Sequence, residues 1–195
     1  MSEKKVYEIM HMDRRVAKIN DSGQCKIYYK SFMPYNLYLE EAEDIDTLVN
    51  NITNFNYWCA TRILTLDRKY AKEILNSIGM LQAVTDKERA KIALSYRCAS
   101  LTDVFWVKIN KEKISFIDVN LYENHLDNTF IDIALRGKQY TVQNEYLARD
   151  LSTNGCFPKA WQRINDGFRL LKDGGSDAVE RELLASQICR CFNVS

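Results

Sequence analysis

The spacing of apolar residues changes twice along this chain, and these changes limit the folds it can adopt. Apolar side chains alternate with polar ones over residues 16–19 and 25–28, which is typical of strands with one buried face. Between about residues 44 and 98 they recur every three to four positions, as in a helix that buries one side. Short alternating runs return after residue 104. Strands on both sides of a helical block predict an α+β fold with antiparallel pairing.

Turn signals place the boundaries of the expected elements. Residues 20–23, Asn-Asp-Ser-Gly, tolerate positive φ or bond their own backbone, so a β-hairpin is expected there, with a third strand over residues 6–9. Helical segments are expected around residues 45–52, 58–64, 70–78 and 85–96, the last of them starting at the capping-box spacing of Thr85 and Glu88. Further strands are expected over residues 104–109, 114–117 and 130–134.

Composition limits the environment and the partners. The chain has 195 residues, 46% of them hydrophobic, enough for a sizeable core without disulfides or metal. Its 27 Lys and Arg residues nearly balance its 26 Asp and Glu residues, so the net charge gives no reason to expect nucleic acid or a membrane. No apolar run approaches the roughly 18 residues of a membrane span, and we expect a cytoplasmic protein. A junction is expected over residues 136–150, between an N-terminal α+β region (1–145) and a C-terminal segment (146–195).

Cysteines, histidines and acidic residues predict no metal site and no catalytic residue. The six cysteines form no Cys-x-x-Cys pair and lie in apolar surroundings, so reduced and mostly buried thiols are expected. His11 and His125, the only histidines, occur in unrelated contexts. The acidic run 40–46 is interpreted as the solvated start of a helix rather than a cation site.

An aromatic-rich segment lies beside two lysines, Lys26 and Lys30. Its rings are Tyr28, Tyr29, Phe32, Tyr35 and Tyr38. Such rings could stack on nucleic-acid bases, but packing into strand faces and the core is the preferred interpretation.

The C-terminal segment holds the most chemical information. A polar loop of Ser152, Thr153, Asn154 and Gly155 precedes two short strands, a turn and a helix, and Lys172 ends the second strand. A triphosphate needs backbone donors from a loop and a fixed cation, which a carboxylate of the neighbouring helix can hold in place. The order of elements suits this arrangement.

Glu180 and Glu182 are the candidate partners for that cation. Glu180 is preferred because a helical wheel places it one turn before Leu184, on the side taken to face inward. Two alternatives stay open. Asp177 and Glu180 have the spacing of a helix cap, and residues 152–155 can form an ordinary turn in a fold that binds nothing.

Several strings, in this order along the chain, carry a resemblance to a protein family. They are Ser100-Leu-Thr-Asp-Val-Phe-Trp-Val-Lys108, Val119-Asn-Leu-Tyr-Glu-Asn124, Phe157-Pro-Lys-Ala-Trp161, Leu170-Leu-Lys-Asp-Gly174 and Glu182-Leu-Leu-Ala-Ser186. The chain resembles HipA-like Ser/Thr kinases of Firmicutes and their mobile elements. The resemblance implies a small N-terminal region followed, over residues 146–195, by elements in the order of the N-terminal lobe of a kinase. It also implies that residues 152–155 cover the phosphates of a nucleotide, with Ser152 or Thr153 as a candidate autophosphorylation site. Lys172 would then be the nucleotide-binding lysine.

The resemblance also implies an incomplete catalyst. The family's catalytic aspartate, its nearby asparagine and its metal-binding aspartate lie on a C-terminal lobe, which would begin where this sequence reaches Ser195. We therefore expect weak binding of ATP with magnesium at most, no other cofactor, and the missing lobe as a protein partner. The alternative function is a mobile-element-encoded binding module without enzymatic activity, an antitoxin-like protein or an anti-CRISPR-type inhibitor of a host-defence target.

Overall fold

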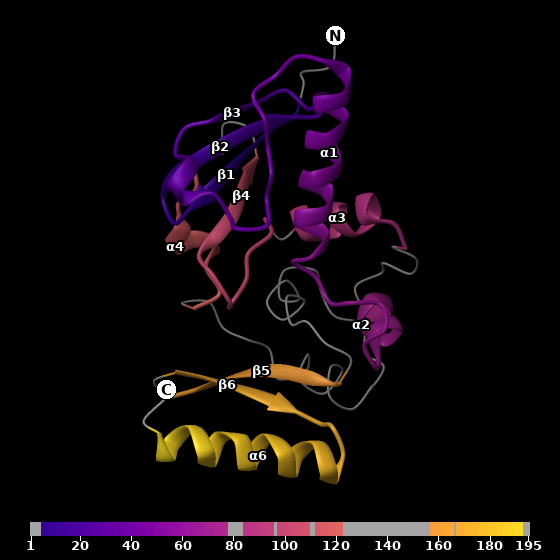
Figure 1. Cartoon of the computed structure of the whole chain (residues 1–195), viewed down its shortest axis with the longest axis vertical. Helices are drawn as coiled ribbons and strands as arrows, with labels where there is room; N and C mark the ends of the chain where they lie inside the picture. The colour runs from indigo at the N-terminus through magenta and orange to yellow at the C-terminus, as the bar shows by residue number, and fades with distance from the viewer. Residues whose placement is uncertain are drawn as a thin grey trace.

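A computed structural model describes residues 5–77, 84–95, 97–109, 112–122, 157–165 and 167–192 of the chain. It confirms the predicted α+β fold with antiparallel sheets and an N-terminal hairpin (Figure 1). The elements are β1 (Val6–His11), β2 (Arg14–Asn20), β3 (Cys25–Ile27), the 3-10 helix η1 (Lys30–Phe32), α1 (Ile45–Ala60), α2 (Ala71–Ser77), α3 (Asp86–Ser95), β4 (Phe105–Ile109), α4 (Phe116–Val119), β5 (Lys159–Ile164), β6 (Gly167–Lys172) and α6 (Ser176–Cys191).

The first sheet has the strand order β3-β2-β1-β4, with antiparallel neighbours throughout. The chain folds into β2 and β3 because Asn20 organises the turn between them: its Oδ1 accepts hydrogen bonds from the backbone N–H groups of Ser22 and Gln24, each at 3.0 Å. Gly23 in this turn has φ +87°, as the sequence predicted for one of these positions. Strand β4, which follows β1 by almost 100 residues in the sequence, pairs with β1. It forms the edge of the sheet opposite β3.

Helix α1 covers one face of this sheet and α3 packs against α1 (Figure 1). Asp44 caps α1, since its Oδ1 accepts from the Thr47 N–H at 2.9 Å, which confirms the acidic run as a helix start. The core beneath α1 contains Ile9, Ile19 and Trp58, all at most 1% exposed. Burial of apolar side chains from both layers is therefore what joins helix and sheet.

Two buried polar side chains tie α1 to its surroundings. Asn51, 2% exposed, accepts from the Glu40 N–H and donates to the carbonyl oxygens of Glu40 and Gly23, all within 3.0 Å. Arg62, just after α1, pairs with Asp103 at 2.6 Å. Arg62 also donates to the carbonyl oxygens of Cys98 and Phe105, so both buried side chains have hydrogen-bond partners, as buried polar groups need.

The predicted strand over residues 114–117 is wrong, because the chain forms helix α4 there. Asp118 Oδ2 accepts from both the N–H and the hydroxyl of Ser115, at 2.8 and 2.7 Å, and this cap favours a helical turn over a short extended run. The strand expected over residues 130–134 lies outside the described residues. The helical stripe expected over residues 58–64 is split: α1 ends at Ala60, and residues 63 and 64 are buried in the following turn.

Two expectations about burial need correction. Cys59 and Cys98 are buried, but Cys189 and Cys191 are exposed on α6, so the thiols are not mostly buried. The aromatic segment does not pack into the core either, since Tyr29, Tyr35 and Tyr38 are 50%, 94% and 66% exposed. The residues of this region that do lie in the core are Leu37 and Leu39.

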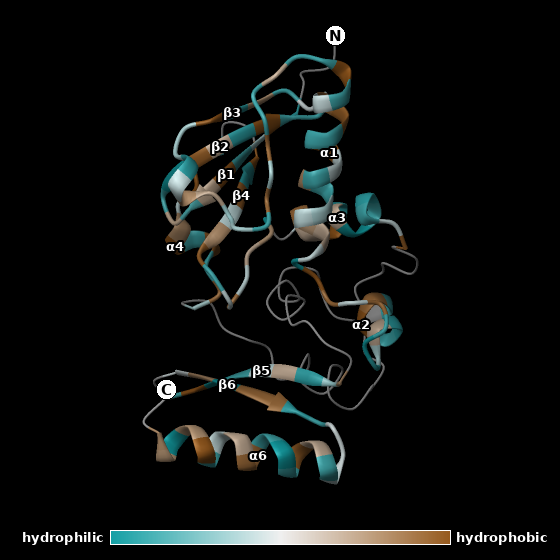
Figure 2. Cartoon of the chain, in the orientation of Figure 1, coloured by the Kyte–Doolittle hydropathy of each residue, from teal (hydrophilic) through white to brown (hydrophobic). Residues whose placement is uncertain are grey.

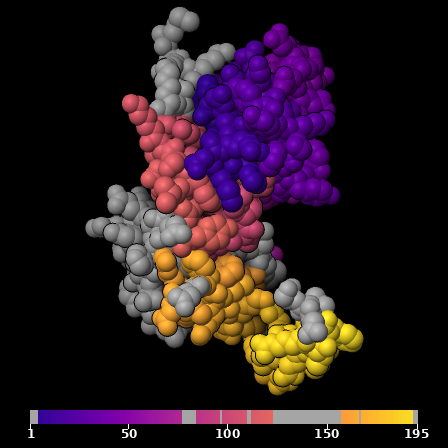
Figure 3. Space-filling view, turned by 90° about the vertical axis from the view of Figure 1, so that its left-hand side faces the viewer, coloured from indigo at the N-terminus to yellow at the C-terminus, as the bar shows by residue number. Residues whose placement is uncertain are grey.

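The second sheet, β5 and β6, contacts the N-terminal part of the molecule. Ala160 of β5 is fully buried in the common core, and Arg68 donates a hydrogen bond to the Lys159 carbonyl oxygen. Helix α6 lies at one end of the molecule, next to this sheet (Figures 1 and 3). None of the helices in the described ranges is both long and apolar enough to cross a bilayer.

Candidate nucleotide site at the second sheet

The β5–β6 hairpin places Lys172 at the beginning of the connection to α6. The two strands pair antiparallel from Lys159↔Lys172 to Ile164↔Gly167. Asp173 then donates its N–H to the Pro158 carbonyl oxygen at 2.9 Å, which holds the end of β6 against the chain entering β5. The strand-turn-strand-turn-helix order predicted from the sequence is therefore present.

Two glycines let α6 start close to β6. Gly175 has φ +76°, a conformation that side-chain-bearing residues rarely adopt. At Gly174 a Cβ atom would lie 2.9 Å from the Ala178 Cβ, closer than such atoms approach. Larger residues would push the first turn of α6 away from the strand.

Lys172 forms an ion pair with Glu182 across the gap between β6 and α6. Its Nζ lies 2.8 Å from Oε1 and 2.6 Å from Oε2 of the carboxylate. Both side chains are largely exposed, at 41% and 62%, so the pair contributes only about 0–1 kcal/mol to stability. Its effect is to orient the ammonium group, which has three N–H donors and can offer one to another anion.

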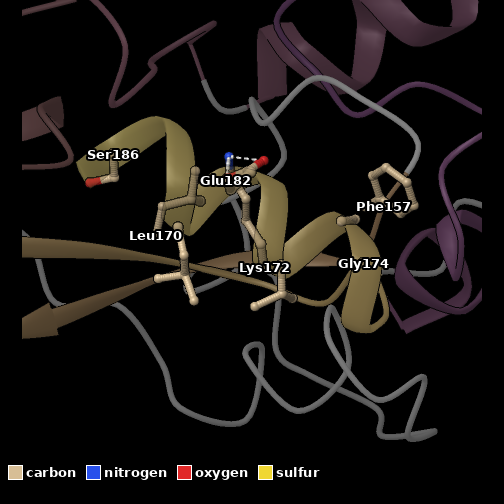
Figure 4. Close-up of a pocket in the computed structure, with 9 residues that line it drawn as sticks. Phe157, Leu170, Lys172, Gly174, Glu182 and Ser186 are labelled. Carbon is tan, nitrogen blue, oxygen red and sulfur yellow. Dashed lines mark hydrogen bonds and ion pairs between the residues drawn. The ribbon is translucent and has the colours of Figure 1, made fainter. Parts of the chain in front are cut away.

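The ion pair lies at a groove of about 430 Å³ between β6 and α6 (Figure 4). Apolar and small side chains supply most of its surface, with Lys172 and Glu182 as the charged groups. The lining residues are Phe157, Leu170, Lys172, Gly174, Ala178, Val179, Glu182, Leu183 and Ser186. A mostly apolar groove with one oriented cation suits a ligand that has a flat apolar part and an anionic part.

The preference for Glu180 as the partner of Lys172 is wrong. Residues 178, 182 and 186 face the groove, and Glu180 lies on a different side of the helix. The helix-cap alternative for Asp177 and Glu180 is wrong as well, because Gly175 occupies the N-cap position without a side-chain bond. Leu184, Ile188 and Phe192, taken from the sequence as the inward side, are 57%, 48% and 75% exposed.

The small residues of the groove carry a signal that the apolar pattern of α6 does not. Ala178 and Ser186 lie one turn before and one turn after Glu182. Small residues at this spacing indicate the side of a helix that approaches a neighbour closely, and they could have identified Glu182. Figure 2 shows apolar residues on more than one side of α6, which is why the apolar pattern alone misled.

The predicted phosphate-covering residues Ser152, Thr153, Asn154 and Gly155 lie outside the described residues. Within the described ranges, no three His, Cys, Asp or Glu side chains gather as metal ligands would. The geometry on which a nucleotide site can be argued is therefore the Lys172–Glu182 pair and its groove.

Comparisons with known proteins add no assignment: no model of a known family, no curated protein and no solved structure matches this chain.

Proposed function

We propose that this chain is the N-terminal portion of a HipA-like kinase, able to bind ATP with magnesium weakly and dependent on a second lobe for phosphoryl transfer. The observation that supports the proposal most is the bidentate ion pair between Lys172 and Glu182. In protein kinases a strand lysine held by a helix glutamate positions the nucleotide phosphates. The same strand, turn and helix order brings the two residues together here.

The groove supports the nucleotide proposal through its composition. Leu170, Val179 and Leu183 offer apolar surface, and Lys172 offers positive charge at the same groove. Residues 152–155 remain the proposed source of backbone donors to the phosphates. Transfer itself needs aspartates that position the nucleophile and the metal, and the family carries these on its second lobe, so we propose no catalysis by this chain alone.

Isothermal titration with ATP and magnesium tests the proposal directly. We expect saturable binding with a Kd on the order of 1 mM, which corresponds to about −4 kcal/mol. Lys172→Ala should weaken binding at least about tenfold, because the oriented cation is lost. Arg169→Ala is the matched control: it removes an exposed cation from the same strand but outside the groove, and should leave the affinity within about twofold.

A second pair of variants tests which carboxylate matters. Glu182→Gln removes the ion pair and should change the affinity for ATP, whereas Glu180→Gln, one half-turn away, should not. If the folded protein shows no heat of binding at several millimolar ATP, or if both lysine and arginine variants behave alike, the nucleotide proposal is wrong.

The exposed side of α6 favours the alternative, a protein-binding module. Leu184, Ile188 and Phe192 form an apolar stripe that stays 48–75% exposed. Such a stripe suits a protein partner, whether the second lobe of a kinase or a toxin or defence protein. A stoichiometric complex that survives Lys172→Ala but is lost in Leu184→Glu would support this function over nucleotide binding.

A further inference from the structure

Arg14, the first residue of β2, is held by aromatic rings at the surface. Its Cζ lies 4.3 Å from the ring centre of Phe32 and 5.4 Å from that of Tyr29. The His11 ring meets Phe32 edge-on, with the centroids 5.4 Å apart. Stacking of this kind orders a guanidinium group without using its N–H donors.

Arg14 differs from several other arginines of the molecule in having no acidic partner among the described residues. Arg15 pairs with Glu8 at 2.6 Å, and Arg62 pairs with Asp103. An exposed, ordered guanidinium with free donors is a ready site for an oxyanion, which it can bind in a bidentate manner.

The surroundings of Arg14 are positively charged although the whole chain is nearly neutral. Residues 11–38 contain five Lys and Arg residues against two carboxylates, and Glu8 of β1 offsets one of the five by pairing with Arg15. One of the two, Asp13, accepts a hydrogen bond from the backbone N–H of Phe116 at 2.6 Å and keeps its negative charge. The nearly neutral chain therefore has a small local excess of positive charge in this region.

Exposed ring faces accompany these cations. Tyr29 and Tyr35 are 50% and 94% exposed, and Phe32 is 36% exposed. A second cation–ring group lies next along the chain, where Arg15 and Lys26 approach the Tyr28 ring at 4.5 and 5.8 Å. Arg14 covers part of the Tyr29 and Phe32 rings, whereas Tyr35 is almost fully exposed and has its ring available to another flat group.

We propose that this aromatic-arginine surface, defined by Arg14, Tyr29, Lys30, Phe32 and Tyr35, binds single-stranded nucleic acid. The bases stack on the rings, and Arg14 and Lys30 contact the phosphates. An acidic peptide would use the cations but would leave the exposed ring faces without flat partners, so the combination favours nucleic acid. The surface is separate from the Lys172 groove and does not depend on the proposed function.

Fluorescence anisotropy with a labelled oligouridine of about 12 nucleotides tests this proposal on the full chain. At low salt we expect a Kd on the order of 10–100 µM that weakens as salt rises. Tyr35→Ala should weaken binding about tenfold, the usual effect of losing one stacked base. Because Tyr35 is almost fully exposed, this variant should keep the fold, which circular dichroism can check.

Arg14→Gln should weaken binding and lower the slope of log affinity against log salt by about one. Tyr57→Ala on α1 and Lys91→Gln on α3, an exposed ring and an exposed cation elsewhere, should leave binding unchanged. The proposal is overturned if the oligonucleotide does not bind at 0.5 mM protein (about five times the weakest expected Kd). It is also overturned if the controls weaken binding as much as the variants, or if an oligoglutamate peptide binds as tightly as the oligonucleotide.

Discussion

Cys59, near the end of α1, is fully buried, and its thiol should make the stability of the protein depend on pH. Burial raises the pKa of the Cys59 thiol well above its ordinary value, and the neighbouring Cys98 acts in the same direction. A raised pKa in the folded state means that the contribution to stability is complete below the pKa of the unfolded chain, about 8.5. The contribution is lost as the pH rises above that value, because only the unfolded chain then ionises.

We therefore predict that the free energy of unfolding falls between about pH 8.5 and 10, by up to about 1.4 kcal/mol per pH unit for this thiol. Urea denaturation at a series of pH values measures it. Cys59→Ala should show a shallower decline than the parent, whereas Cys189→Ala, which changes an exposed thiol, should not. Equal slopes for all three proteins would show that Cys59 does not titrate on unfolding.

Single residues also show where prediction from the sequence stops. Lys172 could be identified because its position at the end of a strand followed from alternation and turn signals. Its partner could not, because a helical wheel gives the angles between residues but not the rotation of the helix against its neighbours. In the folded chain Ala178, Glu182 and Ser186 line the groove beside β6, and Glu182 rather than Glu180 reaches the lysine.

At the scale of elements, the turn between β2 and β3 is under a strict geometric constraint. Gly23 has φ +87°, and a Cβ at this position would lie 2.1 Å from the Leu48 carbonyl oxygen of α1. We predict that Gly23→Ala lowers the free energy of unfolding by about 3 kcal/mol or more, from backbone strain and the displacement of α1. Chemical denaturation monitored by circular dichroism measures the change.

Gly167 is the matched control for this substitution. It begins β6, its φ is not positive, and a Cβ there would meet nothing within 4 Å. Gly167→Ala should change stability by no more than about 0.5 kcal/mol. A similar loss in both variants would mean that Gly23 does not have a positive φ in the turn.

The elements predicted well are those for which independent signals agree. The β2–β3 hairpin has alternation on both sides of its turn, and α3 has both a capping box and an apolar stripe, with Glu88 accepting from the Thr85 N–H at 3.0 Å. Helix α4 was missed because it is four residues long, and in so short a segment one cap outweighs the preference of the side chains for strands. The aromatic segment was misassigned because the chain leaves the sheet after Ile27, so residues 28–38 form η1 and loops rather than a strand with a buried face.

At the scale of the molecule, burial is distributed unevenly between the two ends of the chain. Helix α1 contributes five buried residues, including Phe55 and Trp58, and α6, which also has 16 residues, contributes none. A helix of this length is barely stable alone in water, so α6 depends on its few contacts with β6. Local opening of α6 should consequently cost much less free energy than global unfolding.

We predict that hydrogen exchange measured by mass spectrometry will show amides of α6 exchanging at least about 100-fold faster than those of α1. ATP with magnesium should slow exchange in α6 if the ligand occupies the groove at Lys172, and a second lobe docked on Leu184 and Ile188 should slow it further. Protection of α6 equal to that of α1 in the isolated chain would mean that other contacts hold the helix. A concentration series then separates contacts within one chain from association between copies, since only association depends on concentration.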